Sequence, residues 1–538
     1  MTAEHVPVLI VGAGAAGLAT SALLAKHGVH SLLVERRREV FLYPKARNLS
    51  FRSLEILRSL GLASEVHAVA EGVSPMVVKS TLNSPDERPG FDVDAVFGGL
   101  DELSPEPPAQ YCPQSRLEPM LLAHTRSLGS EARYGTELSS FRRDDTGVTA
   151  ELRDVDSGES TTVRADYLVA ADGVHSRIRG ALGTTTSGYG ALPIYVAFVY
   201  FRAPWRAFVP HLEGGAAVQV ENADAEGIFV AADRDLGMFI TTYIPGKGET
   251  AEQFTPQRCR ELIVAAVGEP IDVDVIDVAP WQPYEQVADQ FSCGRVILVG
   301  DAAHTMPPFK AGGANAAIQS ADNLAWKLAA VLNGFAGPGL LATYHAERHP
   351  VGRFSARQSL TGPPVSFLHL DDDRPSLPAE EEQPMFALLA GYQYHSDAVV
   401  TDGPAPEDPD AVLLVDELRG QPGTRMPHVW VRHDGRCVST LDLLGPVFTL
   451  FTGDSGGAWL AAAESVSATL GVPVTVRHIA ARGDTVDVDG KWAATTGLGP
   501  AGALLVRPDA FVGWRADDPP DDPNGELLQT LSTILCRD

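Results

Sequence analysis

Short apolar runs separated by alanine-rich or amphipathic stretches dominate the first part of the chain, and this alternation predicts a parallel sheet covered by helices. Residues 8–11 (VLIV) predict a buried strand, the Ala/Leu-rich stretch to Lys26 predicts a helix, and residues 31–34 (SLLV) predict the next strand. Similar runs at 167–171 and 296–299 indicate that distant segments return to the same sheet. A long helix is predicted over residues 316–332, with Gly334 as its stop.

The pattern changes farther along the chain. Between about 183 and 280, strand-like runs at 194–201, 217–220 and 238–243 follow one another without helices between them, which predicts an inserted antiparallel sheet. Past Arg353, acidic and proline-rich residues predict a surface linker. From about residue 400, several short strands and a helix at 458–470 predict a small α/β domain.

These changes predict a first α/β domain in three parts, an inserted sheet and a C-terminal domain. The first domain is expected to comprise residues 1–74, 110–182 and 282–360, with the long helix in its last part. Residues 183–281 are expected to form the inserted sheet, and residues 75–109 an excursion toward it. Residues 361–399 are expected to form a linker or helical segment, and residues 400–538 the C-terminal domain. A chain of 538 residues is too long for one hydrophobic core, so two or three domains are expected.

A glycine-rich turn follows the first predicted strand. Gly12, Gly14 and Gly17 form G-x-G-x-x-G, in which the first glycine makes the tight turn, the second lets a pyrophosphate approach the backbone and the third lets the helix pack on the strand. Free N–H groups at the start of the helix favour an anion there. Glu35 ends the second strand, about 20 residues on, where an acid binds a ribose hydroxyl. Together these features predict a dinucleotide site.

Two more strand ends carry acids at the edge of the sheet where ligands bind. Asp172-Gly173 follows one predicted strand and Gly300-Asp301 follows another. A glycine-rich loop with Gly312 and Gly313 then precedes the long helix and presents N–H groups to negative charge. Basic residues follow Glu35, and composition leaves open whether they contact a diphosphate or form a solvated loop: Arg36, Arg37, Arg38, Lys45 and Arg47.

Composition excludes several classes of protein. The formal charge of −27, from 42 basic and 69 acidic residues, argues against nucleic acid or an anionic membrane surface as a partner. The five cysteines are scattered and lack C-x-x-C spacing, which argues against a disulfide framework or a metal site and favours a reducing, cytoplasmic compartment. The chain has no run of 18 apolar residues, so no membrane span is expected.

In combination, the three strand ends resemble those of the single-component FAD-dependent aromatic hydroxylases, the family with the p-hydroxybenzoate hydroxylase fold. The resemblance includes the loop 307–315 and residues 323–328 (NLAWKL). In the tail, residues 423–428 and 442–445 are similar to the thioredoxin-like domain of phenol hydroxylase and of hydroxylases from bacterial aromatic polyketide pathways. The resemblance implies an α/β fold with three parts. These are a Rossmann-like FAD-binding domain, an inserted antiparallel β-sheet domain for the substrate and a redox-inert thioredoxin-like C-terminal domain.

The resemblance also implies roles for individual residues. It places Pro307 near the reactive flavin carbon, which makes Pro307 a candidate catalytic residue. Lys310, which stands in the same loop where the family usually has glycine, is the second candidate. The residues that it implies for FAD binding are Gly12, Gly14, Ala15, Ala16, Gly17, Glu35, Arg36, Lys45, Arg47, Gln114, Asp172, Gly173, Asp301, Pro308, Gly312, Gly313, Ala314 and Asn315. Asp172 belongs to a motif linked to both FAD and NAD(P)H in this family.

The implied activity is hydroxylation of a phenolic or polyketide-type aromatic substrate by O2, with NADPH or NADH as co-substrate and a flavin C4a-hydroperoxide as the oxygen donor. Two alternatives on the same fold are a Baeyer–Villiger oxygenase and an antibiotic-inactivating oxygenase. A third is a flavoprotein without turnover. The sequence leaves a homodimer, the choice of NADPH or NADH and the identity of any catalytic base open.

Departures from the family pattern lie beside the implied flavin site. Lys45 replaces a usual Arg, Lys310 and Ala311 replace usual glycines, and Ser320 replaces the usual acid after Gln319. The ammonium of Lys310 has three alternatives: it lies over the flavin edge, it meets an acidic or phenolate substrate, or it extends into solvent.

Overall fold

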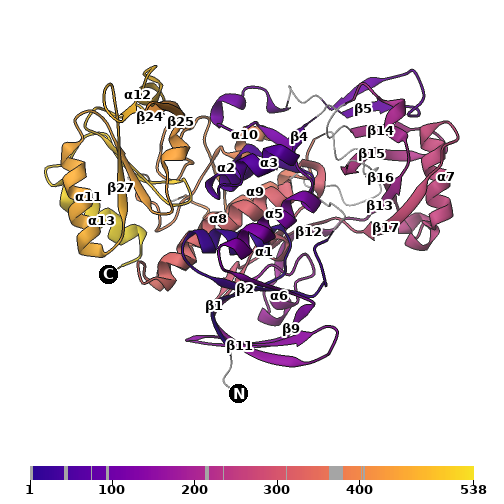
Figure 1. Ribbon diagram of the computed structural model, residues 1–538, viewed down its shortest axis with the longest axis horizontal. Helices are drawn as coiled ribbons and strands as arrows, with labels where there is room; N and C mark the ends of the chain where they lie inside the picture. Colours follow the sequence, from indigo (N-terminus) through magenta and orange to yellow (C-terminus); the bar gives the residue numbers. More distant parts are fainter. Residues whose placement is uncertain are drawn as a thin grey trace.

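An eight-stranded sheet, which we call the central sheet, lies below the helices in Figure 1, which shows the computed structural model. The structure describes residues 4–41, 46–73, 76–91, 96–212, 217–233, 236–310, 312–362, 380–401, 403 and 406–537. Five strands of this sheet are parallel in the order β20–β11–β1–β2–β8, and β19 and the β9–β10 hairpin are antiparallel additions. The strands are β1 (Glu4–Val11), β2 (Ser31–Glu35), β8 (Glu131–Tyr134), β9 (Thr136–Asp144), β10 (Gly147–Asp154), β11 (Ser160–Ala170), β19 (Ser292–Cys293) and β20 (Val296–Leu298).

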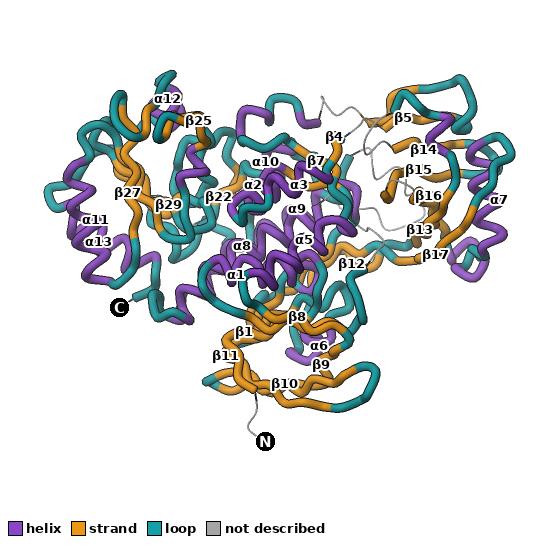
Figure 2. Tube along the Cα trace, in the orientation of Figure 1, coloured by secondary structure: helices purple, strands orange, loops and turns teal. Residues whose placement is uncertain are grey.

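Helices cover this sheet, and α1, α5, α8 and α9 lie side by side in Figures 1 and 2. The helices here are α1 (Ala15–Lys26), α2 (Phe51–Ser59), α3 (Ala63–Val69), α5 (Gln114–Ser127), α6 (Arg177–Leu182), α8 (Gly312–Leu332), α9 (Ala342–Gln358) and α10 (Met385–Leu389). The predicted start of the long helix was wrong, because α8 begins at Gly312 and its first turn includes the glycine-rich residues. Among the described residues, no helix has the length and apolar character needed to cross a membrane.

Three small sheets join these elements. The first consists of β3 (Asn48–Ser50), β7 (Ala109–Tyr111) and β4 (Glu71–Gly72). The second consists of β12 (Thr186–Ala191), β18 (Tyr284–Ala288) and β21 (His304–Thr305). The third is the pair β22 (Tyr392–Gln393) and β23 (Leu413–Leu414).

A second, seven-stranded sheet lies to one side of the centre and is drawn at the right of Figure 1. Its order is β17–β13–β16–β15–β14–β5–β6, antiparallel except for the β14–β5 pair. Its strands are β5 (Met76–Lys79), β6 (Arg88–Phe91), β13 (Tyr195–Arg202), β14 (Ala217–Glu221), β15 (Glu226–Asp233), β16 (Leu236–Tyr243) and β17 (Asp274–Trp281). Strands from the segment 75–109 therefore extend a sheet that otherwise comes from residues 195–281.

This second sheet has a helix that the pattern of strands alone did not predict. α7 (Pro256–Val267) lies between β16 and β17 and packs Cys259, Ile263 and Val267 against one face. The expectation of strands without helices between 183 and 280 is therefore wrong. Local signals for the helix are present, since the Thr255 side chain caps the N-terminus, Pro256 is the first helical residue and Gly268 ends the helix.

The C-terminal domain is a mixed sheet with helices packed on it (Figure 1). Its strand order is β25–β24–β28–β27–β26–β29–β30, and α11 packs against α13. Its elements are β24 (Trp430–His433), β25 (Arg436–Ser439), β26 (Phe448–Thr452), α11 (Gly457–Leu470), β27 (Val474–Ala480), β28 (Thr485–Val486), α12 (Lys491–Thr496), β29 (Ala503–Val506), β30 (Val512–Ala516) and α13 (Pro523–Ile534). Trp326 of α8 is part of its hydrophobic core, so the two domains share packing.

The junction of α8 and α9 with the C-terminal domain buries a network of charged side chains. The Glu347 carboxylate accepts hydrogen bonds from Lys327 at 2.7 Å and from Arg507 at 2.7 and 2.8 Å, and all three side chains are 0% exposed. Arg507 also pairs with Asp509 at 2.6 Å. Burial opposes the negative charge of Glu347, but Arg507 and Lys327 hold its pKa well below the ordinary value. Glu347 therefore carries the charge that balances two buried cations.

A second part of the same junction lies on α2. Arg52 pairs with Asp322 at 2.9 Å and donates to the backbone carbonyl of Asp509 at 2.8 Å. Glu55 accepts from Arg425 of the C-terminal domain and from the Ser104 hydroxyl. Because these contacts join residues far apart in sequence, the C-terminal domain is bound to the centre of the molecule by paired charges as well as by apolar packing.

Candidate active site

The glycine turn connects β1 to α1 at the edge of the central sheet. Gly12 has φ +107°, and an added Cβ there would lie 2.3 Å from the Ala171 carbonyl oxygen. A Cβ at Gly17 would lie 1.9 Å from the Gly12 carbonyl oxygen, so only glycine allows this strand–helix contact. At Gly14 the nearest atom to an added Cβ is 3.9 Å away, and no side chain caps the first turn of α1. The turn thus leaves open space and free N–H groups where Ala15 and Ala16 begin the helix.

Glu35 at the end of β2 is buried beside this turn. Its carboxylate accepts hydrogen bonds from the backbone N–H groups of Ala13, at 2.9 Å, and Arg37, at 2.9 Å. Glu35 therefore fixes the turn and still has acceptor positions for a hydroxyl. Of the basic residues that follow, Arg36 is exposed, Arg37 lies over the Phe41 ring and Arg38 pairs with Asp156.

Asp172 organises the loop that follows β11. It accepts from the Ser176 hydroxyl at 2.6 Å and from the backbone N–H of Ile178 at 3.2 Å, while Gly173 provides a turn with φ +86°. Arg179 on α6 donates to the carbonyls of Val174 and Ala302, both at 2.9 Å. Arg179, which the sequence analysis did not identify, thus joins the loop after β11 to the loop after β20.

Asp301 lies in the short helix η5 (Gly300–Ala302) that follows β20, and its side chain is exposed. A Cβ on Gly300 would lie 2.6 Å from the Cβ of Ala16, so this loop lies directly on the first turn of α1. Since β1, β11 and β20 are adjacent parallel strands, the structure brings the glycine turn, Asp172 and Asp301 to one edge of the sheet.

The loop before α8 lies next to this edge. Pro307 is buried and Pro308 is exposed. An added Cβ on Gly312 would lie 2.5 Å from the Met306 sulfur, whereas Gly313 has open space around it and Ala314 is partly buried. The Asn315 side chain accepts from the Ser50 N–H at 2.9 Å and therefore anchors the start of α8 to α2.

Lys310 ends the short helix η6 (Pro308–Lys310) in the same loop. Its ammonium donates to the Thr361 hydroxyl at 2.9 Å and to the Glu382 carboxylate at 2.8 Å. The Lys310 side chain is only 8% exposed, so the alternative that placed it in solvent is wrong.

Two further candidates lie between the central sheet and the second sheet. Gln114 at the start of α5 accepts from the Ala46 N–H at 3.2 Å. Arg47 is largely buried near Tyr111 and Tyr200; burial lowers its pKa, and within the described residues its guanidinium makes no hydrogen bond or ion pair. Such a guanidinium is available to an anionic ligand. Lys45 and Ala311 lie outside the described residues.

The second sheet presents an apolar face opposite α7, which we call the apolar wall. Its members are Val196, Phe198, Tyr200, Val230, Ala232 and Met238, with Trp281 packed beside them. Among the described residues the buried Nε1 of Trp281 has no hydrogen-bond partner. The wall is thus a set of buried apolar side chains, each at most 7% exposed, with the unpartnered Trp281 N–H beside it.

Ser320 on α8 contacts two buried groups. Its hydroxyl lies 3.0 Å from Nε2 of His304 and accepts from Nε of Arg348 at 3.1 Å. Burial, with the nearby Arg348 cation, lowers the pKa of His304 to about 3, so this histidine is neutral. Ser320 is thus an internal packing residue and does not belong to the edge where the glycine turn, Asp172 and Asp301 meet, which we call the ligand edge.

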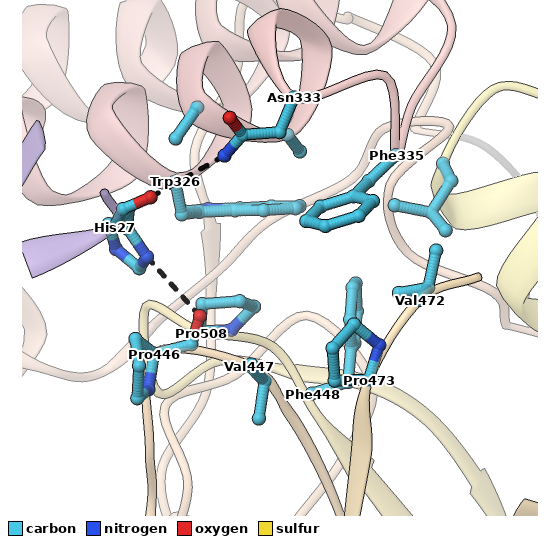
Figure 3. Close-up of a pocket in the computed structure, with 13 residues that line it drawn as sticks. His27, Trp326, Asn333, Phe335, Pro446, Val447, Phe448, Val472, Pro473 and Pro508 are labelled. Atoms are coloured by element: carbon cyan, nitrogen blue, oxygen red, sulfur yellow. Dashed lines mark hydrogen bonds between the residues drawn. The ribbon is translucent and has the colours of Figure 1, made fainter. Parts of the chain in front are cut away.

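Figure 3 shows a separate apolar crevice between α8 and the C-terminal domain, lined by Trp326, Phe448 and several prolines. His27 Nδ1–H donates to the Pro446 carbonyl at 3.2 Å, and burial lowers the pKa of His27 to about 3. His27 follows the C-terminal end of α1, about 18 Å along that helix from the glycine turn. The crevice is therefore distinct from the ligand edge.

Comparisons with known proteins agree with this geometry. Residues 5–359 match the family described as "FAD binding domain", and residues 419–537 match "Aromatic-ring hydroxylase, C-terminal". This chain belongs to the FAD-dependent aromatic-ring hydroxylases. The FAD cofactor, the flavin monooxygenase class and the fold that the sequence resemblance implied are confirmed, and NAD(P)H is the typical co-substrate of the family.

Several relatives of this hydroxylase match it over their whole length. Tetracenomycin A2 monooxygenase-dioxygenase from Streptomyces glaucescens is 38% identical, with 100% of this chain and 98% of the relative covered. Aklavinone 12-hydroxylase RdmE from Streptomyces purpurascens is 36% identical, with 100% and 99% covered. The crystal structure of a ternary complex of aklavinone-11 hydroxylase with FAD and aklavinone has a TM-score of 0.87 at 35% identity and covers 100% of both chains.

The residues of this hydroxylase fit FAD. The open space at Gly14, the uncapped start of α1 and the remaining acceptor positions of Glu35 are features that a dinucleotide uses.

Proposed function

We propose that this monooxygenase hydroxylates an electron-rich ring of a large, flat aromatic substrate of the polyketide type, with electrons from NADPH or NADH. The apolar wall is the observation that carries the substrate class, because sites for fused rings are lined mainly by apolar and aromatic side chains such as Phe198, Tyr200 and Met238. Relatives named for tetracenomycin and aklavinone support this class. Trp281 supplies a free N–H that would orient a substrate carbonyl or hydroxyl.

We assign FAD to the edge where the three strand ends meet. The N–H groups at Gly14, Ala15 and Ala16 bind the pyrophosphate, Glu35 binds the adenosine ribose, and Asp301 binds the ribityl region. Gln114 at the start of α5 and Arg47, just before β3, contact the cofactor, and Asp172 with Gly173 holds the adjacent loop. The ring lies against Pro307, Pro308 and the backbone of residues 312–315. Bound FAD supplies the electron transfer and oxygen activation, and the protein orients the substrate and excludes water.

The domains follow from the same proposal. Residues 1–74, 110–182 and 282–360 bind FAD, residues 183–281 with the excursion 75–109 bind substrate, and residues 400–538 form the C-terminal domain. Scattered cysteines without C-x-x-C spacing support a cytoplasmic location. A homodimer is the assembly to test by light scattering.

The activity is tested by supplying purified protein with NADPH, isotopically heavy O2 and a panel of phenolic polycycles. The expected result is substrate-stimulated NADPH oxidation and a product with one heavy oxygen on a ring carbon. Oxygen inserted between a carbonyl and its neighbouring carbon would instead show a Baeyer–Villiger oxygenase. Flavin absorbance that NADPH and NADH both fail to bleach would show a flavoprotein without turnover.

The FAD assignment predicts that Gly14→Ala weakens FAD binding at least tenfold while leaving the fold intact. Gly14 has φ −81° and ψ −176°, which alanine adopts readily, and the protein leaves room for the added Cβ. That methyl group instead occupies the space assigned to the pyrophosphate. Fluorescence titration of the apoprotein with FAD measures the effect.

Gly457→Ala is the matched control, because an added Cβ there meets no atom within 4 Å and Gly457 is an exposed residue at the start of α11, in the C-terminal domain. It should leave FAD affinity unchanged. Equal FAD affinity in Gly14→Ala and wild type would show that the pyrophosphate lies elsewhere.

A further inference from the structure

Lys310 is the one cation that this chain places in the loop 307–312, and the structure gives that cation a fixed partner. The Glu382 carboxylate lies 2.8 Å from its ammonium and the Thr361 hydroxyl lies 2.9 Å from it. Glu382 is 72 residues away in sequence and is itself 48% exposed, whereas Lys310 is 8% exposed. The ion pair therefore joins a buried point of the loop to a surface segment.

Residues 380–383 form that segment, which we call the strap. It is attached to the C-terminal end of α9 by three contacts. Arg357 donates to Glu380 at 2.7 Å, Gln358 donates to the Glu381 carbonyl at 3.0 Å, and the Gln383 N–H donates to the Gln358 side chain at 2.9 Å. Because α9 packs on α8, the strap is held by the rigid part of the molecule.

The backbone also shapes the place where Glu382 lies. Gly362 follows α9 with φ +84°, and an added Cβ there would lie 2.3 Å from the Glu382 carboxylate. The Thr361 hydroxyl donates to the Gln358 carbonyl at 2.9 Å, which orients its oxygen to accept from Lys310. Glu382 and Thr361 thus form a built acceptor site for a single ammonium group.

We propose that Glu382 is a positioning residue for the hydroxylation reaction. Through Lys310 it fixes η6 to the strap and to α9, and it keeps the lysine charge away from the substrate. This inference rests on the proposed placement of the flavin ring beside that loop. With the pair intact, η6 stays in place beside the flavin side of the site; without it, η6 is held less firmly, water has more access and more NAD(P)H is spent on hydrogen peroxide.

The variants are Glu382→Gln, Lys310→Met and the double variant. Glu381→Gln is the matched control, because Glu381 is adjacent and exposed and contacts Gln358 only through its backbone carbonyl. Glu382→Gln and Lys310→Met should each lower the product formed per NADPH consumed at least twofold, and the double variant should be no worse than Lys310→Met alone. Glu381→Gln should equal wild type, and FAD affinity should change less than twofold in all four proteins.

A second measurement does not need the substrate. Iodide should quench the fluorescence of bound FAD at least twofold more strongly in Glu382→Gln and Lys310→Met than in wild type or Glu381→Gln. If wild type forms no product but quenching follows this pattern, the proposed function fails, while the part of the inference that Glu382 holds η6 in place beside the flavin stands. Unchanged quenching in both single variants, or additive losses in the double variant, would overturn the positioning role.

Discussion

Glu347→Gln is expected to destabilise the full-length protein by about 3–5 kcal/mol, which is the usual effect of removing one partner from a buried ion pair. The variant leaves Lys327 and Arg507 buried with too little negative charge, since all three side chains are 0% exposed. A loss of this size is a large fraction of the stability of a typical protein. Urea unfolding followed by fluorescence, together with the soluble yield, measures it.

Glu417→Gln is the control for this prediction. Glu417 pairs with Arg419, but the two side chains are 62% and 65% exposed, so its loss should change the free energy of unfolding by less than about 1 kcal/mol. Similar unfolding curves for Glu347→Gln and Glu417→Gln would show that the buried network contributes little to stability.

Mild acid is expected to unfold the holoenzyme well before its carboxylates titrate. Burial is the main cause that lowers the pKa of His27 and His304 to about 3, and that of His349 and His428 to about 4. The unfolded chain binds protons at these histidines below its ordinary pKa of about 6.5, while the folded chain does not. Stability is therefore full above pH 6.5 and falls as the pH drops toward 4.

The free energy of unfolding should fall steeply with pH, because each such histidine contributes up to about 1.4 kcal/mol per pH unit and the four together up to about 5.6 kcal/mol per pH unit. Urea unfolding at pH 8, 6.5 and 5.5 measures it. His428→Gln should reduce the slope by about a quarter, whereas His211→Gln, at a side chain that is 52% exposed, serves as the control. A free energy of unfolding that stays constant from pH 6.5 to 5 would contradict the prediction.

Local patterns in the sequence were sufficient to predict that the three strand ends meet at one edge of the sheet. The glycine turn, Asp172 and Asp301 each follow an apolar run, and parallel strands place their carboxyl ends together. Local patterns could not predict the partners of Lys310 and Glu347. Glu382 is 72 residues from Lys310, and Arg507 is 160 residues from Glu347, and no periodicity in the sequence relates either pair. The helix α7 had local signals in Thr255, Pro256 and Gly268, and a search for caps would have found it.

The charged junction also restricts how this enzyme can be engineered. A chimera that exchanges residues 400–538 with those of a relative would separate Arg507 and Arg425 from Glu347 and Glu55. Unless the donor carries the same charges in the same places, the hybrid would bury unpaired groups on both sides of the graft. Productive crossovers should therefore transfer the matching positions on α2, α8 and α9 together with the tail, so these distant segments form one unit of recombination.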